Sequence, residues 1–177
     1  MAYTVIRTDL LSGTKQPADL LSVRVYDAEG NMIDAENGVI VKIGALEDGE
    51  REVYKATLAT ANDPLYECAI LAGVELMYDE RKKSLDEYIN EAGKAVRAYI
   101  PRTRNMWSIT KEGFVNEEVP EVGGAVAIGE GGKLVAAESD GIGTCIAIEQ
   151  AGKYVMYVIR NMNTEVAPAS GGDGGNG

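Results

Sequence analysis

The stretch Gly124-Ala-Val-Ala-Ile-Gly-Glu-Gly-Gly-Lys-Leu-Val-Ala-Ala-Glu138 carries the pattern that decides the fold. Two short apolar runs flank Glu130-Gly131-Gly132, and glycines in that position favour a tight turn between two strands. Further turn signals follow at Ser139-Asp140-Gly141 and Ala151-Gly152-Lys153, with β-rich runs between them. This spacing predicts an antiparallel hairpin meander over residues 119–160, as found in sandwiches and small barrels.

The meander should have a buried and an exposed face, because successive side chains of a strand point to opposite sides of the sheet. The paired, alternating strands are where we expect the core to concentrate. The residues expected to be buried are Val126, Ile128, Leu134, Val135, Ile146, Ile148, Val155 and Tyr157.

Residues 23–78 also have the composition of strands and turns. Asn37-Gly38 precedes a β-branched run at residues 39–44, and Asp48-Gly49 predicts another tight turn. Residues 65–77 predict one or two further strands. This half of the chain therefore extends the β-rich domain towards the N-terminus.

Residues 79–92 form the one segment with helical spacing. Asp79 could cap the start of a short helix and Gly93 could end it. Residues 95–99 then alternate as a strand that closes at Pro101. The apolar residues at helical spacing are Leu85, Tyr88, Ile89 and Ala92.

Taken together, these patterns predict a mainly β fold: an antiparallel β-barrel or sandwich-like domain with one short helix and an extended N-terminal arm. We expect the arm at residues 1–22, the β-rich domain at residues 23–160, and a flexible tail at residues 161–177. The tail ends in Ser170-Gly-Gly-Asp-Gly-Gly-Asn-Gly177, which has no apolar residue to bury.

The N-terminal arm is apolar and has no adjacent turn to pair it into a hairpin. Two interpretations follow. The arm docks on a partner, as exposed apolar segments often do, or it adds an edge strand to the chain's own sheet. The residues that the first interpretation assigns to partner binding are Tyr3, Val5, Leu10 and Leu11.

The chain contains no histidine, which removes the commonest general base and metal ligand. Ser108-Ile-Thr-Lys111 matches a Ser-x-x-Lys motif, but the partner motifs of penicillin-recognising enzymes are absent. We therefore expect no catalysis, no metal site and no cofactor. Cys68 and Cys145 lie in apolar stretches and are expected to be buried free thiols.

The formal net charge is −11, from 28 acidic and 17 basic residues. This charge opposes binding to nucleic acid and to anionic membranes, so neither is expected as a partner. The N-terminus has no signal-peptide pattern, which predicts synthesis and folding in a reducing cytoplasm. Arg97, Arg102 and Arg104 form a local basic and aromatic group with Trp107, which has either a protein interface or a structural role.

The run from Gly123 to Ile148, with a strand, a turn, the strand Lys133-Leu-Val-Ala136, a glycine turn and the strand that begins Gly141-Ile-Gly143, resembles the head decoration proteins of tailed bacteriophages. Residues 10–15 and 41–52 also resemble small structural proteins of phages that infect Gram-positive hosts.

This resemblance implies a non-enzymatic virion protein, made in the host cytoplasm, that binds the major capsid protein on the capsid exterior and stabilises the expanded head. It also implies self-association as a homotrimer or another homo-oligomer. Two alternatives stay open: a phage tail or neck component, and a cellular β-barrel binding module.

Overall fold

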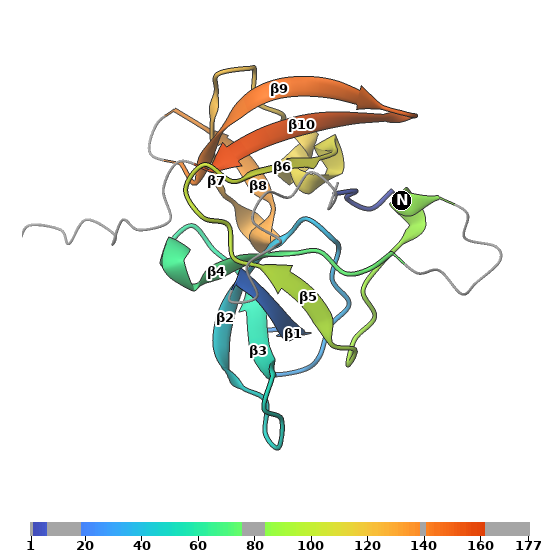
Figure 1. Ribbon diagram of the computed structural model, residues 1–177, viewed down its shortest axis with the longest axis vertical. Helices are drawn as coiled ribbons and strands as arrows, with labels where there is room; N and C mark the ends of the chain where they lie inside the picture. Colours follow the sequence, from blue (N-terminus) through green and yellow to red (C-terminus); the bar gives the residue numbers. More distant parts are fainter. Residues whose placement is uncertain (1, 7–18, 76–83, 139–140, 162–177) are drawn as a thin grey trace, which may run out of the picture.

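A computed structural model describes residues 2–6, 19–75, 84–138 and 141–161. The fold is mainly β, as predicted, and consists of a closed five-stranded barrel below a second five-stranded sheet (Figure 1). None of the helical turns in the described residues has the length and apolar character needed to span a membrane.

The first half of the chain forms the barrel, in the strand order β1-β3-β2-β4-β5 with β5 returning to β1. Four of its five strand pairs are antiparallel, as predicted, whereas β1 and β3 run parallel, with Val23 opposite Tyr54. The strands are β1 (Leu20–Tyr26), β2 (Ile40–Leu46), β3 (Val53–Leu58), β4 (Cys68–Leu71) and β5 (Val96–Tyr99).

The second sheet is antiparallel throughout and has the order β6-β10-β9-β7-β8. The two hairpins predicted within residues 119–160 are present, as β7 with β8 and β9 with β10. The simple meander is wrong, because β9 pairs with β7 rather than with β8. The strands are β6 (Met106–Ile109), β7 (Ala125–Ile128), β8 (Leu134–Ala137), β9 (Gly143–Ala151) and β10 (Tyr154–Asn161).

Two glycines allow β9 to lie against β7. A Cβ atom added at Gly141 would lie 1.9 Å from the carbonyl oxygen of Val126, and one added at Gly143 would lie 2.7 Å from that of Arg160. Both distances are shorter than any side chain tolerates. The chain therefore passes close to β7 and β10 at this point only because both positions lack a side chain.

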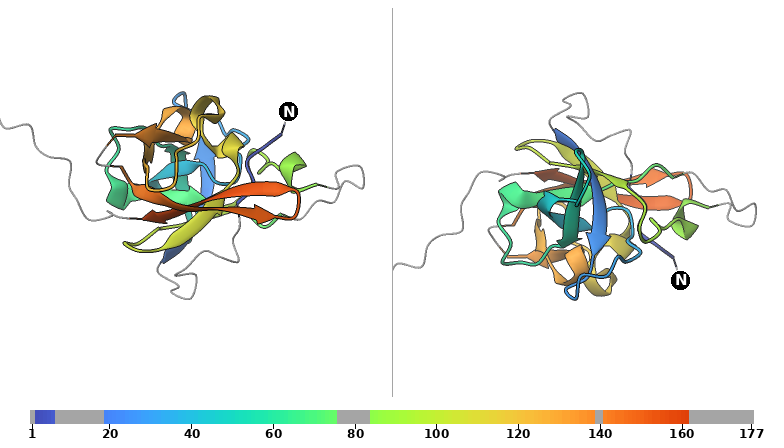
Figure 2. Two further views of the ribbon diagram at one scale, coloured as in Figure 1. Left: turned by 90° about the horizontal axis from the view of Figure 1, so that it is seen from above. Right: turned by 90° about the horizontal axis from the view of Figure 1, so that it is seen from below.

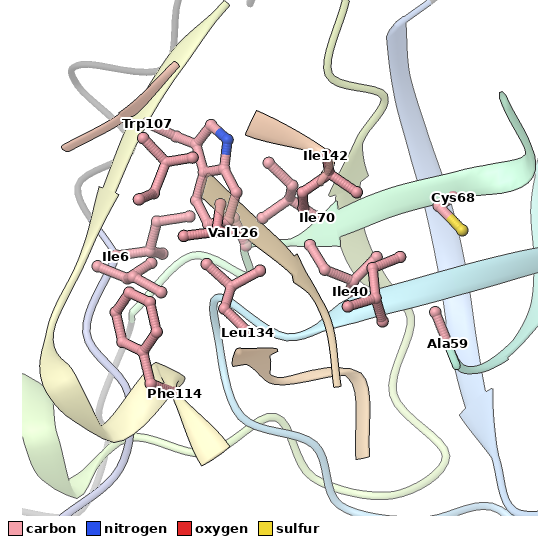
Figure 3. Close-up of a cluster of buried hydrophobic side chains, with 14 of the residues drawn as sticks. Ile6, Ile40, Ala59, Cys68, Ile70, Trp107, Phe114, Val126, Leu134 and Ile142 are labelled. Atoms are coloured by element: carbon pink, nitrogen blue, oxygen red, sulfur yellow. The ribbon is translucent and has the colours of Figure 1, made fainter. Parts of the chain in front are cut away.

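Two hydrophobic cores share one wall, formed by β2 and β4. Side chains such as Val41 and Leu71 point into the barrel, where they pack with small residues of the other strands. Their neighbours Ile40 and Ile70 point the other way and pack against the second sheet around Trp107 (Figure 3). These two strands are therefore buried on both faces.

The predicted burial is right for β7 and the start of β8, where Val126, Ile128 and Leu134 are buried. It is wrong for Ile148 and Val155, which are exposed. The remaining predicted residues, Val135, Ile146 and Tyr157, are partly buried. The residues of β9 and β10 that are buried instead are Cys145, Met156, Val158 and Ile159.

Ile148 and Val155 are exposed because of their place along the hairpin: Tyr157, on the same face, packs against the core between the two sheets, whereas these two residues lie closer to the hairpin tip. A β-bulge lies at the inner end of the hairpin. The register shifts between Val158 and Ile159, so that Ala147 faces Val158 while Cys145 faces Ile159. An extra residue in one strand reverses the alternation of faces beyond it. The extra residue is Ile146 in β9, which has no partner in β10, so Cys145 and Ile148 share a face although they are three residues apart.

The predicted helix at residues 79–92 lies partly outside the described residues. Its described part, residues 84–92, contains only a 3₁₀ turn, Leu85–Glu87, which Ser84 caps. The backbone then becomes extended, because Asn90 bridges Ala35 and its side-chain amide donates to the Ala35 carbonyl oxygen at 3.0 Å. The other 3₁₀ turns that the structure describes are Leu65–Glu67, Lys111–Gly113, Val115–Glu117 and Glu130–Gly132.

Two predicted boundaries also need correction. The predicted arm, residues 1–22, overlaps β1, which begins at Leu20. The tail was placed at residues 161–177, but Asn161 is the last residue of β10. The other residues of the tail lie outside the described part of the chain.

The shared wall leads to a test of cooperativity. We expect Ile70→Ala to lower the free energy of unfolding by about 2–5 kcal/mol, because it removes buried atoms from between the two sheets. Trp107, the only tryptophan, reports on the second sheet by fluorescence, while circular dichroism reports on all strands. Urea titrations followed by both signals should shift together. Separate midpoints would show that the two sheets unfold independently.

Candidate interaction surfaces

The described part of the N-terminal arm packs into the chain's own fold. Thr4, Val5 and Ile6 are each only 2% exposed. Ile6 forms an antiparallel bridge with Ile109 at the edge of β6 and belongs to the core between the two sheets. Residues 2–6 of the arm therefore pack against the chain's own sheet, while residues 7–18 lie outside the described part of the chain.

A carboxylate from the barrel holds this segment in place. Glu36 Oε2 accepts hydrogen bonds from the Thr4 backbone N–H at 3.0 Å and from Thr4 Oγ1 at 2.8 Å. The other oxygen, Oε1, lies 3.3 Å from Lys133 Nζ in the second sheet's half of the chain. Gly38 leaves room for the Thr4 side chain, since a Cβ atom there would lie 2.8 Å from Thr4 Cγ2.

The four arm residues predicted to bind a partner are placed as follows. Tyr3 is partly exposed, and its backbone N–H donates to the carbonyl oxygen of Asp86. Val5 is buried and offers no surface in this conformation. Leu10 and Leu11 lie outside the described residues.

The predicted basic and aromatic group does not form one surface. Trp107 is fully buried, and its Nε1 donates to Asn161 Oδ1 at 3.2 Å. Arg102 is exposed but forms an ion pair with Asp19, and its Nε lies 2.8 Å from both carboxylate oxygens. Arg97 is exposed on β5 of the barrel. For Trp107, and for the Arg102 pair, the structural interpretation is the one that the contacts support.

One described cluster contains residue types used in catalysis. Lys153 and Tyr154, at the turn between β9 and β10, both donate hydrogen bonds to Asp86 Oδ1 at 2.9 Å. Lys153 also donates to Ser84 Oγ. The cluster clamps the tip of the β9–β10 hairpin onto the Leu85–Glu87 turn.

The electrostatics of the clamp are those of an ion pair. Hydrogen bonds from Ser84, Lys153 and Tyr154 hold the pKa of Asp86 well below its ordinary range. The hydrogen bond to Asp86 raises the pKa of Lys153, so that its amine stays protonated at neutral pH. A protonated lysine cannot take a proton from Ser84, and the cluster therefore lacks the general base that a Ser-Lys mechanism needs.

The two cysteines are buried and free, as predicted. Burial raises the pKa of Cys68 to about 12 and also raises the pKa of Cys145, so both remain thiols at neutral pH. A thiol is a poor nucleophile and a poor metal ligand compared with a thiolate. Among the described residues, no three side chains of metal-ligating type come together.

The surface feature that sequence reasoning missed is the outer half of the β9–β10 hairpin, which extends beyond the barrel (Figure 2). Ile148 and Val155 are 48% and 44% exposed there. The pairings Ile148 with Tyr157 and Gln150 with Val155 place both apolar side chains on one face of the hairpin. Their alternation is visible in the sequence and predicts burial, but it does not show that the hairpin extends beyond the core.

Comparison of the chain with models of protein families, with curated proteins and with solved structures finds no match in any of the three. The chain's own residues and surfaces are therefore the basis for assigning a function.

The position of Ile6 leads to a stability test. We expect Ile6→Ala to lower the free energy of unfolding by about 2–5 kcal/mol, because the side chain is buried between the two sheets. Ile148→Ala, at an exposed position, should change it by at most about 0.5 kcal/mol. Urea denaturation measures both. An unchanged midpoint for Ile6→Ala would mean that the N-terminal segment is not seated beside Ile109.

The Asp86 clamp leads to a pH test. Its pKa is lower in the folded than in the unfolded chain, so its contribution to stability is full above the ordinary carboxyl pKa of about 3.9 and is lost as the pH falls below that value. We expect Asp86→Asn to be less stable than the wild type at pH 6, with a gap that shrinks steadily below pH ~4. Urea titrations across this range measure the gap.

Asp48→Asn is the matched control, because Asp48 is an almost fully exposed carboxylate paired with Lys55. Exposed pairs contribute little to stability, so this variant should follow the wild type at every pH. A gap for Asp86→Asn that stays constant with pH would show that the ionised carboxylate does not stabilise the hairpin.

Proposed function

We propose that this chain is a non-enzymatic structural protein of a tailed-phage virion, which binds the outer surface of the capsid and stabilises the expanded head. The observation that carries the proposal is the pair of filled cores on the two sides of one wall. A body of this kind is rigid, and its outer surface is the part available to a partner.

The barrel interior supports a structural role over small-molecule binding. It is filled by buried aliphatic side chains, several of them alanines, from all five strands. A ligand-binding barrel instead keeps a cavity of several hundred Å³ with converging polar groups. A small apolar cavity, lined by Ile40, Leu65 and Cys68 among others, has room for about one water molecule.

The chemistry of the described polar groups also favours a structural role. Glu36, Asp19 and Asp86 each hold two segments of the chain together through lysine, arginine, threonine or tyrosine partners. These groups act as clamps that increase rigidity. The acidic net charge of −11 adds solubility and favours a partner with a basic surface.

The segment that resembles head decoration proteins forms β7, β8 and the first half of β9. These strands pack on the shared wall, so the resemblance concerns the framework of the second sheet. A phage tail or neck component is the second candidate, because it would use the same rigid, acidic body.

Co-sedimentation with phage shells tests the proposal. The chain is mixed with expanded empty capsids and, in parallel, with unexpanded precursors and with isolated tails of the phage that encodes it. We expect it to pellet with expanded capsids in a fixed ratio to the major capsid protein, because the contact sites form on expansion. Binding to tails alone would support the second candidate, and binding to none of the three would contradict a virion role.

A further inference from the structure

Strand β9 has a long free edge. Its nine residues pair with β10 along one side. On the other side, β7 pairs only with Gly143 and Thr144, and the backbone of Gly123 and Gly124 reaches Cys145. Within the described part of the chain, residues 146–151 therefore have no neighbouring strand on that side, and β9 is the outermost strand of the hairpin in Figure 1.

This edge has little of the protection that exposed strands usually have, namely one charged residue, Glu149, and a bulge at its first residue, Ile146. Natural edge strands carry lysine or proline, or are covered by a loop, because a bare row of N–H and C=O groups pairs with other chains. Residues 146–151 read Ile-Ala-Ile-Glu-Gln-Ala and contain no proline and no basic residue. Ile148, the most exposed apolar residue of the strand, lies in the middle of the free edge.

The charges around the edge indicate the kind of partner. Glu149 is exposed within it. The loop that leads into Gly123 contributes the exposed carboxylates Glu118 and Glu121, and the hydrogen bond from the Gly123 N–H to the Cys145 carbonyl oxygen brings this loop beside β9. A second copy would bring the same acidic residues and a net charge of −11, which opposes close approach.

We infer that the free edge of β9 at residues 146–151 receives an extended strand of the capsid protein, with basic side chains towards Glu149 and an apolar side chain against Ile148. The inference rests on the proposed function and names the surface that performs it. Main-chain hydrogen bonds of the added strand supply affinity, and the side chains on the two faces supply specificity. Many copies on one shell multiply the effect of each contact.

A single substitution and a matched control test the edge. Ile148→Lys places the protective residue of natural edges at the centre of the exposed strand, and we expect capsid binding to weaken about tenfold or more. Leu46→Lys makes the same chemical change at a residue 42% exposed at the end of β2, on the far side of the barrel, and should bind like the wild type. Both sites are exposed, so both variants should keep the wild-type melting temperature.

Charge reversal tests the chemistry of the partner. Glu149→Lys should also weaken capsid binding, and wild-type binding should weaken as salt screens the attraction between Glu149 and a basic strand. Capsid binding that is independent of salt and unchanged by Glu149→Lys would overturn the basic character assigned to the added strand.

Hydrogen exchange on the capsid-bound protein locates the contact. Protection of the amides of residues 146–151 on binding, with no change for the β2–β3 turn, supports strand addition. If the wild type binds capsids, Ile148→Lys binds equally well and these amides stay unprotected, the inference is overturned and the proposed function stands. Failure of the wild type to bind any capsid would overturn both. A concentration-dependent dimer in sedimentation equilibrium that Ile148→Lys abolishes would assign the edge to a second copy instead.

Discussion

The burial of β2 and β4 on both faces is the constraint on which the rest of this structure depends. Each strand supplies one set of side chains to the barrel interior and another to the core beneath the second sheet. The runs Val39-Ile-Val41 and Cys68-Ala-Ile-Leu71 are consequently continuous in their apolar character, without the alternation of a strand that has one wet face. Because each core depends on side chains from this wall, we expect the barrel and the second sheet to unfold together.

The same wall explains why the N-terminal segment packs inside the fold. Ile6 extends the core past the edge of β6, and Thr4 fills the space left by Gly38 and Gly113 between the barrel and the second sheet. A segment placed in this way closes an edge of the fold, and its apolar residues are used internally. An apolar N-terminal segment can therefore fill an open edge of its own sheet, and its apolar character alone does not indicate a partner surface.

The local features of this fold could be predicted from the sequence, and the long-range ones could not. Glycine turns such as Gly131, with a φ of 65°, mark the β7–β8 hairpin because few other residues adopt that conformation. The bulge at Ile146 and the extension of the β9–β10 hairpin beyond the barrel leave no mark in the sequence, so the exposure of Ile148 and Val155 could not be predicted. Asp19 and Arg102 are 83 residues apart, and no local pattern joins them.

The candidate surface arises from one of these long-range choices. A meander would have placed β8 beside β9. Gly141 and Gly143 instead let β9 start against β7, which has only four residues and leaves the second half of β9 uncovered. The hairpin can extend beyond the barrel because Asp86 and Lys153 fasten its tip. The glycines therefore create the free edge, and the clamp holds it in a fixed position, which lowers the entropic cost of adding a strand from another protein.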